Sequence, residues 1–208
     1  ENEIVNIRIH DIRDYSHHKH RKVDDYPFGG GGGMVLKPEP IFSAIESIKK
    51  DISEREGIEV AGNTKVVLLS PQGEVFDQRK ATLFSELRSV IFLCGHYDGI
   101  DERVIDQLVD VEISIGDYVL SGGELPAMVI IDSIVRLLPG SLGNSKSIED
   151  DSHYNGGLIQ FPQYTRPSSF RGLDVPDVLL SGNHKDINQW RINQSIKRTI
   201  IKRPDLIN

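Results

Sequence analysis

Residues 65–73 read KVVLLSPQG, a run of aliphatic residues followed directly by serine, proline and glycine. An uninterrupted apolar run of this length is typical of a strand that is buried on both faces, as in parallel sheets. Two later runs have a similar character, VIFLC at residues 90–94 and VEISI at residues 111–115. Together the three runs predict a mostly parallel sheet at the core of the molecule.

Helical segments alternate with these runs. Isoleucine recurs from Ile41 to Ile52 with helical spacing, and Gly57 follows as a stop signal. We expect a short helix over residues 102–108 and a longer one over residues 125–138, with Pro126 in its first turn. Strands that alternate with helices in this way predict an α/β fold in which helices pack on the sheet.

The pattern changes after residue 140. Residues 141–157 (SLGNSKSIEDDSHYNGG) are polar, rich in glycine and serine, and aperiodic. Helical periodicity returns over residues 189–202, where isoleucines at 192, 196 and 200 share one face. We therefore expect an α/β domain over residues 1–140, a flexible linker over 141–160 and a small helical C-terminal domain over 161–208.

The composition is that of an ordinary globular protein. The 208 residues are 38% hydrophobic and 26% charged, which argues against a disordered chain or a fibre, and no apolar run approaches the length of a membrane span. The single cysteine, Cys94, excludes an internal disulfide framework and a cysteine-built zinc site. A cytoplasmic protein without a membrane partner is expected. The net charge of −7 argues against general coating of nucleic acid.

Basic residues nevertheless cluster in two places. Residues 184–208 hold six basic residues against two acidic ones, and residues 17–22 read HHKHRK. A solvated surface and a local contact with nucleic acid are both open interpretations of such clusters. The three histidines of the second cluster could suggest a metal, but the neighbouring cations favour a basic loop.

Each apolar run ends in a loop of small residues. These loops are SPQG at residues 70–73, GHYDG at 95–99 and GDYVLSGG at 116–123. Because the carboxyl ends of parallel strands meet at one edge of a sheet, we expect a ligand site there, with glycines that let backbone amides approach the ligand. The phosphate-loop pattern is absent and no lysine or arginine stands beside the glycines. A neutral or zwitterionic ligand with an adenine and a ribose fits better than a polyphosphate.

The loops lie within longer motifs, and these resemble the bacterial tRNA (guanine-N1)-methyltransferase family of the SPOUT superfamily. The resemblance covers essentially the whole chain in order. The motifs that carry it are residues 20–34 (HRKVDDYPFGGGGGM), 70–73, 95–103 (GHYDGIDER), 116–126 (GDYVLSGGELP), 153–167 with its YTRP segment, and 178–184 (VLLSGNH).

The resemblance implies a deep trefoil knot in the C-terminal half of the α/β domain and an obligate homodimer whose chains share the active site. It also implies that the loops bind S-adenosylmethionine. The expected cofactor contacts are Leu69, Ser70, Pro71, Gly95, Tyr97, Gly99, Ile115, Gly116, Asp117, Tyr118, Val119 and Leu120, with Gly122 and Gly123 shaping the pocket. Magnesium dependence is a further family expectation, although no carboxylate cluster in the sequence indicates a metal site.

The family reaction methylates N1 of guanosine at position 37 of tRNA, so a base must remove the N1 proton and a cation must balance the charge on O6. The resemblance assigns the base to Asp151, with Asp150 as its rival, and the cation to Arg136. Solvation or helix capping is the alternative for Asp151. An ion pair with Asp132, one helical turn away, is the alternative for Arg136.

The basic clusters are expected to face the tRNA. By resemblance, Lys19, Arg21 and Lys22 with Asp24 form an RNA-facing loop, whereas Arg191, Arg198 and Lys202 would contact phosphates from the C-terminal domain. Three other functions remain open at this point. They are a SPOUT methyltransferase for another RNA base or a ribose 2′-hydroxyl, a tRNA-binding protein without catalysis, and a nucleotide-sensing regulator.

Overall fold

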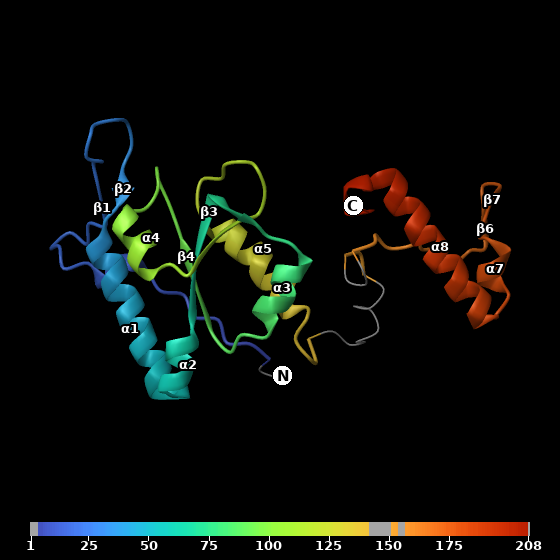
Figure 1. Cartoon of the computed structure of the whole chain (residues 1–208), viewed down its shortest axis with the longest axis horizontal. Coiled ribbons are helices and arrows are strands. Elements are labelled where there is room, and N and C mark those ends of the chain that lie inside the picture. The colour runs from blue at the N-terminus through green and yellow to red at the C-terminus, as the bar shows by residue number, and fades with distance from the viewer. Residues whose placement is uncertain (1–3, 142–150, 154–156, 208) are drawn as a thin grey trace. The chain divides into compact units, whose positions relative to one another are not determined.

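The computed structural model describes residues 4–141, 151–153 and 157–207. The chain divides into two compact units, Glu1–Ser141 and Leu142–Asn208. Figure 1 shows a first unit of strands and helices and a second unit dominated by one long helix. Across the described ranges, no helix is both long enough and apolar enough to cross a membrane.

A three-stranded parallel sheet forms the centre of the first unit. Its order is β4 (Val90–Cys94), β3 (Lys65–Val75) and β5 (Val111–Ser114). Both β4 and β5 pair with β3 in parallel, in a register that sets Lys65 beside Val90. The predicted parallel strands are therefore confirmed, and the apolar run at residues 65–69 occupies the middle position.

The strand β3 continues beyond the predicted end at Leu69. Leu69 and Glu74 both pair with Ile113 of β5, so residues 70–73 leave the regular ladder and the chain then returns to it. A Cβ atom on Gly73 would collide with the backbone of Glu112 and Ile113. Only glycine fits this close approach, which holds the first loop against the neighbouring strand.

Both faces of the sheet are covered, which explains the uninterrupted apolar sequence of its central strand. Val66 and Leu68 pack into one hydrophobic cluster, while Val67 and Leu69 pack into another. Alternate residues of a strand point to opposite faces, so every position in this run must be apolar.

The helices form a layer on each face (Figure 1). The first cluster includes residues of α1 (Pro38–Glu56), α2 (Ile58–Asn63) and α4 (Glu102–Leu108), and the second includes residues of α3 (Gln78–Ser85) and α5 (Glu124–Val135). The predicted helices α1 and α4 are confirmed, and α1 stops at Gly57, where φ is +102°. The helix α5 ends three residues before the predicted position 138.

Several short elements were missed because they are too brief for a periodic pattern to show. They are α2, α3, the 3-10 helix η1 (Ile12–Tyr15), and the hairpin of β1 (Asp24–Asp25) and β2 (Val35–Leu36). The glycine run at residues 29–33 lies in the loop of this hairpin, where four of its five glycines have positive φ.

The second unit is built around α8 (His184–Lys202). The helix begins five residues before the predicted start, because the Asn183 side chain accepts a hydrogen bond from the Lys185 amide at 3.1 Å and caps its first turn. The other elements are the hairpin of β6 (Ser169–Phe170) and β7 (Leu173–Asp174), the helix α7 (Asp177–Leu180) and the 3-10 helix η2 (Pro204–Ile207).

The end of the predicted linker packs on α8. Thr199 is fully buried, and its hydroxyl accepts a hydrogen bond from the Ile159 amide at 3.0 Å and donates one to the Ser195 carbonyl at 2.7 Å. Nearby, the Gln160 amide donates to the Ser152 hydroxyl at 2.9 Å. These described residues are therefore fixed to the second unit by hydrogen bonds.

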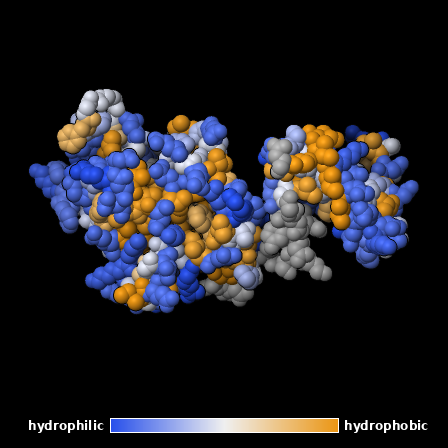
Figure 2. Space-filling model, viewed as in Figure 1, coloured by the Kyte–Doolittle hydropathy of each residue, from blue (hydrophilic) through white to orange (hydrophobic). Residues whose placement is uncertain are grey.

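The apolar stripe of α8 faces outward. Ile192, Ile196 and Ile200 are 53%, 41% and 55% exposed, and Figure 2 shows hydrophobic residues over this helix. Arg191 and Arg198 are half-buried. The side of α8 that packs within its own unit is consequently the one that carries Thr199 and these arginines.

Candidate cofactor and RNA site

The second and third loops meet at the carboxyl edge of the sheet. The Gly123 amide donates a hydrogen bond to the Gly95 carbonyl at 2.9 Å, and His96 forms an isolated antiparallel bridge with Gly122. Gly95 also lies beside the first loop, since a Cβ atom placed on it would be 3.9 Å from the Leu69 carbonyl oxygen. The structure thus brings together predicted cofactor residues from all three loops.

Two positions of the third loop require glycine, Gly123 because of a close contact and Gly116 because of its backbone conformation. A Cβ atom on Gly123 would lie 2.7 Å from Cys94 Cα and 3.0 Å from the Gly95 nitrogen, both of them backbone atoms. Gly116 adopts φ of +150°, a conformation that favours glycine. The role of Gly122 and Gly123 in shaping a cofactor pocket, and the contact of Gly116 with the cofactor, both stay predictions.

Ser114 was missed by the sequence reasoning. It is 4% exposed, and its hydroxyl donates to the Gly116 carbonyl at 2.9 Å and accepts from the Gly116 amide at 3.1 Å. This double contact fixes the turn by which the chain leaves β5. The available signal was a hydroxyl residue directly after Ile113 at the end of the strand, because a buried hydroxyl must find partners.

Apolar and aromatic side chains of the loops remain accessible. Tyr97, Tyr118, Val119 and Leu120 are all exposed. Tyr97 has φ of +60°, and its ring packs edge-on against His96 with centroids 4.6 Å apart. Accessible rings beside backbone amides and carbonyls suit a ligand with a flat heterocycle and a ribose, which is the chemistry of S-adenosylmethionine.

The remaining predicted contacts lie in the same loops. The Ser70 hydroxyl accepts a hydrogen bond from the Gln72 amide at 3.1 Å, and the Tyr118 hydroxyl donates to the Ile115 carbonyl at 3.3 Å. Pro71, Gly99 and Asp117 occupy the first, second and third loops respectively. The predicted cofactor residues therefore lie in neighbouring loops along one edge of the sheet.

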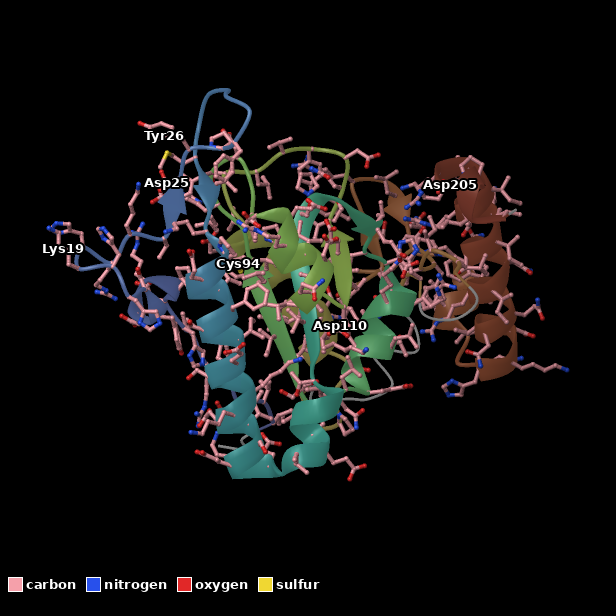
Figure 3. All side chains as sticks on the ribbon, turned by 60° about the vertical axis from the view of Figure 1, so that its left-hand side comes forward. Lys19, Asp25, Tyr26, Cys94, Asp110 and Asp205 are labelled. Atoms are coloured by element: carbon pink, nitrogen blue, oxygen red, sulfur yellow. The ribbon has the colours of Figure 1, made fainter. Side chains whose placement is uncertain are left out.

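Cys94, labelled in Figure 3, ends β4 directly beneath the second loop. Burial, together with the nearby Glu124 carboxylate, raises the pKa of the Cys94 thiol to about 11. The thiol is therefore neutral at pH 7 and acts as a packing group rather than as a nucleophile.

The proposed catalytic residues belong to different units. Arg136 is exposed and follows the last residue of α5, where its amide donates to the Asp132 carbonyl at 3.1 Å. The helix α5 is only partly buried, because Leu125, Met128 and Val129 are 58%, 65% and 48% exposed. The helix covers the sheet with one side only.

Asp151 belongs to the second unit and is half-buried, and Asp150 lies outside the described residues.

The basic loop before β1 is largely neutralised by its own acidic residues. Arg21 pairs with Asp14, and Lys22 pairs with Asp25 at 3.3 Å. Lys19, at the edge of the unit in Figure 3, is exposed and forms no ion pair with any described residue. Asp24 is half-buried in β1. Lys19 is thus the most available cation of the loop.

The predicted RNA-binding residues of α8 differ in accessibility. Lys202 is exposed, whereas the Nε atoms of Arg191 and Arg198 are buried without a hydrogen-bond partner among the described residues. The Arg191 guanidinium stacks over the Phe161 ring, 4.7 Å from its centroid. Arg191 therefore combines a packing contact with unused hydrogen-bonding capacity.

The whole chain, residues 1–208, matches the family model described as tRNA (Guanine-1)-methyltransferase TrmD. The chain belongs to this family. It is 56% identical over 207 residues to a tRNA (guanine-N(1)-)-methyltransferase of Alkaliphilus oremlandii, an alignment that covers 100% of this chain and 82% of the relative. Proteins of the same name from Staphylococcus carnosus and Bacillus cereus are 55% and 54% identical. These alignments cover 99% and 100% of this chain and 79% and 82% of the relatives.

Membership makes the chain a methyltransferase, as the resemblance of its motifs indicated. The parallel α/β sheet of the first unit agrees with the fold class expected for the family. The described residues contain no group of three or more histidine, cysteine, aspartate or glutamate side chains that could hold a metal ion. Magnesium dependence remains a prediction carried by the resemblance alone.

Proposed function

We propose that this methyltransferase transfers a methyl group from S-adenosylmethionine to N1 of guanosine at position 37 of tRNA, in the cytoplasm. The observation that carries the proposal is the match of the family over all 208 residues. The contiguous loops at the carboxyl edge of the sheet support it, because they offer the backbone groups and accessible rings that this cofactor requires.

The three loops would hold the cofactor through backbone amides and carbonyls such as those of Gly95 and Gly116, with Gly123 shaping the pocket through its hydrogen bond to Gly95. When bound, S-adenosylmethionine supplies the methyl group as an activated sulfonium. Tyr97 and Tyr118 are the accessible aromatic side chains of the loops and would cover its adenine ring.

Asp151 would accept the proton from guanine N1, which frees the ring lone pair for methylation. Arg136, on the first unit, would donate hydrogen bonds to O6 as this oxygen becomes anionic. General base catalysis contributes about 10²- to 10⁴-fold to a rate, and a positioned cation adds a further large factor. The assignment rests on the resemblance, and Arg136 is exposed.

The homodimer and the trefoil knot belong to the same proposal. Leu125, Met128 and Val129 form an exposed apolar face on α5, and Val119 of the third loop is 83% exposed. A second copy that covers this face would remove apolar surface from water next to the cofactor loops. For the knot, the support is the family match alone.

The direct test is transfer of a labelled methyl group to tRNA transcripts with guanosine or adenosine at position 37. We expect label only on the guanosine transcript. Equal labelling of both would identify another RNA position and overturn the proposal. Binding of the cofactor without any transfer would instead indicate the non-catalytic or regulatory function.

The role of Asp151 as general base is tested with Asp151→Asn, which removes the proton-accepting carboxylate and preserves the shape of the side chain. We expect kcat to fall at least about 100-fold, with S-adenosylmethionine still bound. Asp174→Asn, on the exposed β6–β7 hairpin of the same unit, is the matched control. An unchanged rate in Asp151→Asn would exclude the assignment.

A further inference from the structure

A cavity of about 340 Å³ lies within the second unit, outside the cofactor loops and the proposed catalytic residues. Residues 161–168 form one wall, and residues of α7 and α8 form the other. Two motifs that so far have no function meet here, the YTRP segment at 164–167 and the VLLSGNH segment at 178–184. The volume is at the lower end of the range of small-ligand sites, about 300–1,000 Å³.

The cavity offers aromatic surface to a planar ligand. Tyr164 and Trp190 both line it, with ring centroids 6.3 Å apart and planes inclined by 53°. The inclination means that a flat group would stack on one ring rather than enter between the two. Tyr164 is 49% exposed, so its ring is the accessible platform, and Trp190 lies beside it.

The charge of the cavity is positive. Arg166 and Arg191 line it, and none of the lining residues is acidic. Neither arginine forms an ion pair with a described residue, and the buried Nε of Arg191 lacks a hydrogen-bond partner within the same ranges. Phe161 holds the Arg191 guanidinium from one side, which leaves the cation ordered and available to an anion.

We propose that this cavity binds an unstacked nucleotide of the tRNA substrate, with its base against Tyr164 and its phosphate at Arg166 and Arg191. Aromatic rings that stack bases and arginines that pair with phosphates are the usual means of holding single-stranded RNA. The inference rests on the proposed function, because it assigns a second contact to the same tRNA. It makes Tyr164 and Arg166 RNA-positioning residues that do not touch the reacting atoms.

Trp190 is the only tryptophan of the chain, so its fluorescence reports on this cavity alone. We expect unmodified tRNA with guanosine at position 37 to quench the emission of the full chain in a saturable titration. Free AMP at the same concentration should leave the emission unchanged, because a single nucleotide lacks the contacts of the rest of the RNA. Quenching by AMP and not by tRNA would identify a mononucleotide site and overturn the proposal.

The variants Tyr164→Ala and Arg166→Ala should each raise the KM for tRNA about tenfold, with kcat changed less than about twofold. Tyr164→Phe preserves the ring and should retain the wild-type KM, which separates the loss of stacking from a failure to fold. Phe170→Ala removes an exposed aromatic residue of the same unit outside the cavity and should also leave KM unchanged.

The two proposals fail in different ways. If the wild-type protein methylates guanosine 37 while Tyr164→Ala and Arg166→Ala keep its KM and tRNA does not quench Trp190, the cavity assignment is wrong and the proposed function stands. If the wild-type protein binds tRNA with quenching but transfers no methyl group, the proposed function is wrong and the cavity remains an RNA site.

Discussion

Ser114 and Gly123 show how single residues fix the cofactor loops. The hydroxyl of Ser114 contacts both backbone groups of Gly116, and Gly123 lies directly against the backbone of Cys94 and Gly95. Neither residue offers a functional group to a ligand. Their contribution is to determine the path of the backbone groups that would do so.

The substitution Gly123→Ala tests this contribution. The new methyl group would lie 2.7 Å from Cys94 Cα, so the second and third loops must separate. Overpacking of this kind costs about 1–3 kcal/mol, and we expect the Kd for S-adenosylmethionine to rise at least about tenfold in calorimetric titration. Gly32→Ala is the matched control, because a Cβ atom there meets nothing within 4 Å. Equal affinity in the two variants would show that the contact between the loops does not matter for binding.

The Cys94 thiol provides a pH-dependent prediction. Since its pKa is raised to about 11 in the folded protein, from about 9.0, the neutral thiol is the form that the fold favours. Its contribution to stability is complete below pH 9 and is lost as the pH rises towards 11. We expect alkylation of the native protein by iodoacetamide to remain slow through pH 9, and to be fast at that pH after unfolding in urea. Rapid alkylation of native protein at pH 8 would contradict this.

At the scale of elements, Asp110 ties the beginning of β3 to the beginning of β5. Its carboxylate accepts hydrogen bonds from the Val66 amide at 2.8 Å and from the Lys65 ammonium at 3.1 Å. Burial raises the pKa of the Asp110 carboxyl, but these two donors outweigh it and the net pKa lies below the ordinary value. The central strand is thus held by an electrostatic contact as well as by its ladder.

Replacing Asp110 with asparagine should lower the free energy of unfolding by about 1–2 kcal/mol at pH 7, because a charged acceptor for two donors is lost. The pKa is lowered in the fold, so the stabilisation is present above the unfolded value of about 3.8 and disappears as the pH falls through the folded value. Urea unfolding of the variant and of the exposed control Asp106→Asn, at pH 7 and pH 3, measures both effects. A difference between the two variants that is as large at pH 3 as at pH 7 would contradict the linkage.

At the scale of the whole molecule, the proposed dimer depends on the exposed face of α5. Met128→Asp introduces a charge at a position that is 65% exposed in one chain and would be buried between two. We expect sedimentation to show a monomer, and methyl transfer to be lost if the active site is shared. Ile58→Asp, at an 83% exposed position on α2, is the control and should sediment as the wild type does. A dimer that survives Met128→Asp would place the interface elsewhere.

The whole molecule carries a net charge of −7, so tRNA must be attracted by local groups. Lys19 is the exposed cation of the basic loop without an ion pair among the described residues. The association constant for tRNA is expected to fall as the salt concentration rises. In Lys19→Ala, the plot of its logarithm against the logarithm of the salt concentration should be less steep by about 0.7–0.9, the value for one phosphate contact. Lys50→Ala is the control and should leave the slope unchanged. Lys50 lies in α1, with its Nζ 3.9 Å from Glu54 Oε1.

The strands and longer helices were predictable because their residues carry the pattern locally. The apolar run from Val66 to Leu69 requires cover on both faces, and the isoleucines of α1 recur with the helical period. The loops after the strands could also be located, and their motifs indicated the family. Short elements such as α2 and α3 escaped, since a few residues contain too little periodicity.

The amino-acid sequence by itself therefore determined the parallel α/β core, the position of the glycine loops and the family. Only the tertiary structure decided which surfaces stay open. It left the isoleucine stripe of α8 and three apolar residues of α5 exposed. It also placed Arg191 against Phe161 and brought Tyr164 beside Trp190 across 26 residues of chain. Periodicity shows that a helix has two sides, whereas the side that becomes buried depends on contacts between segments far apart in the sequence.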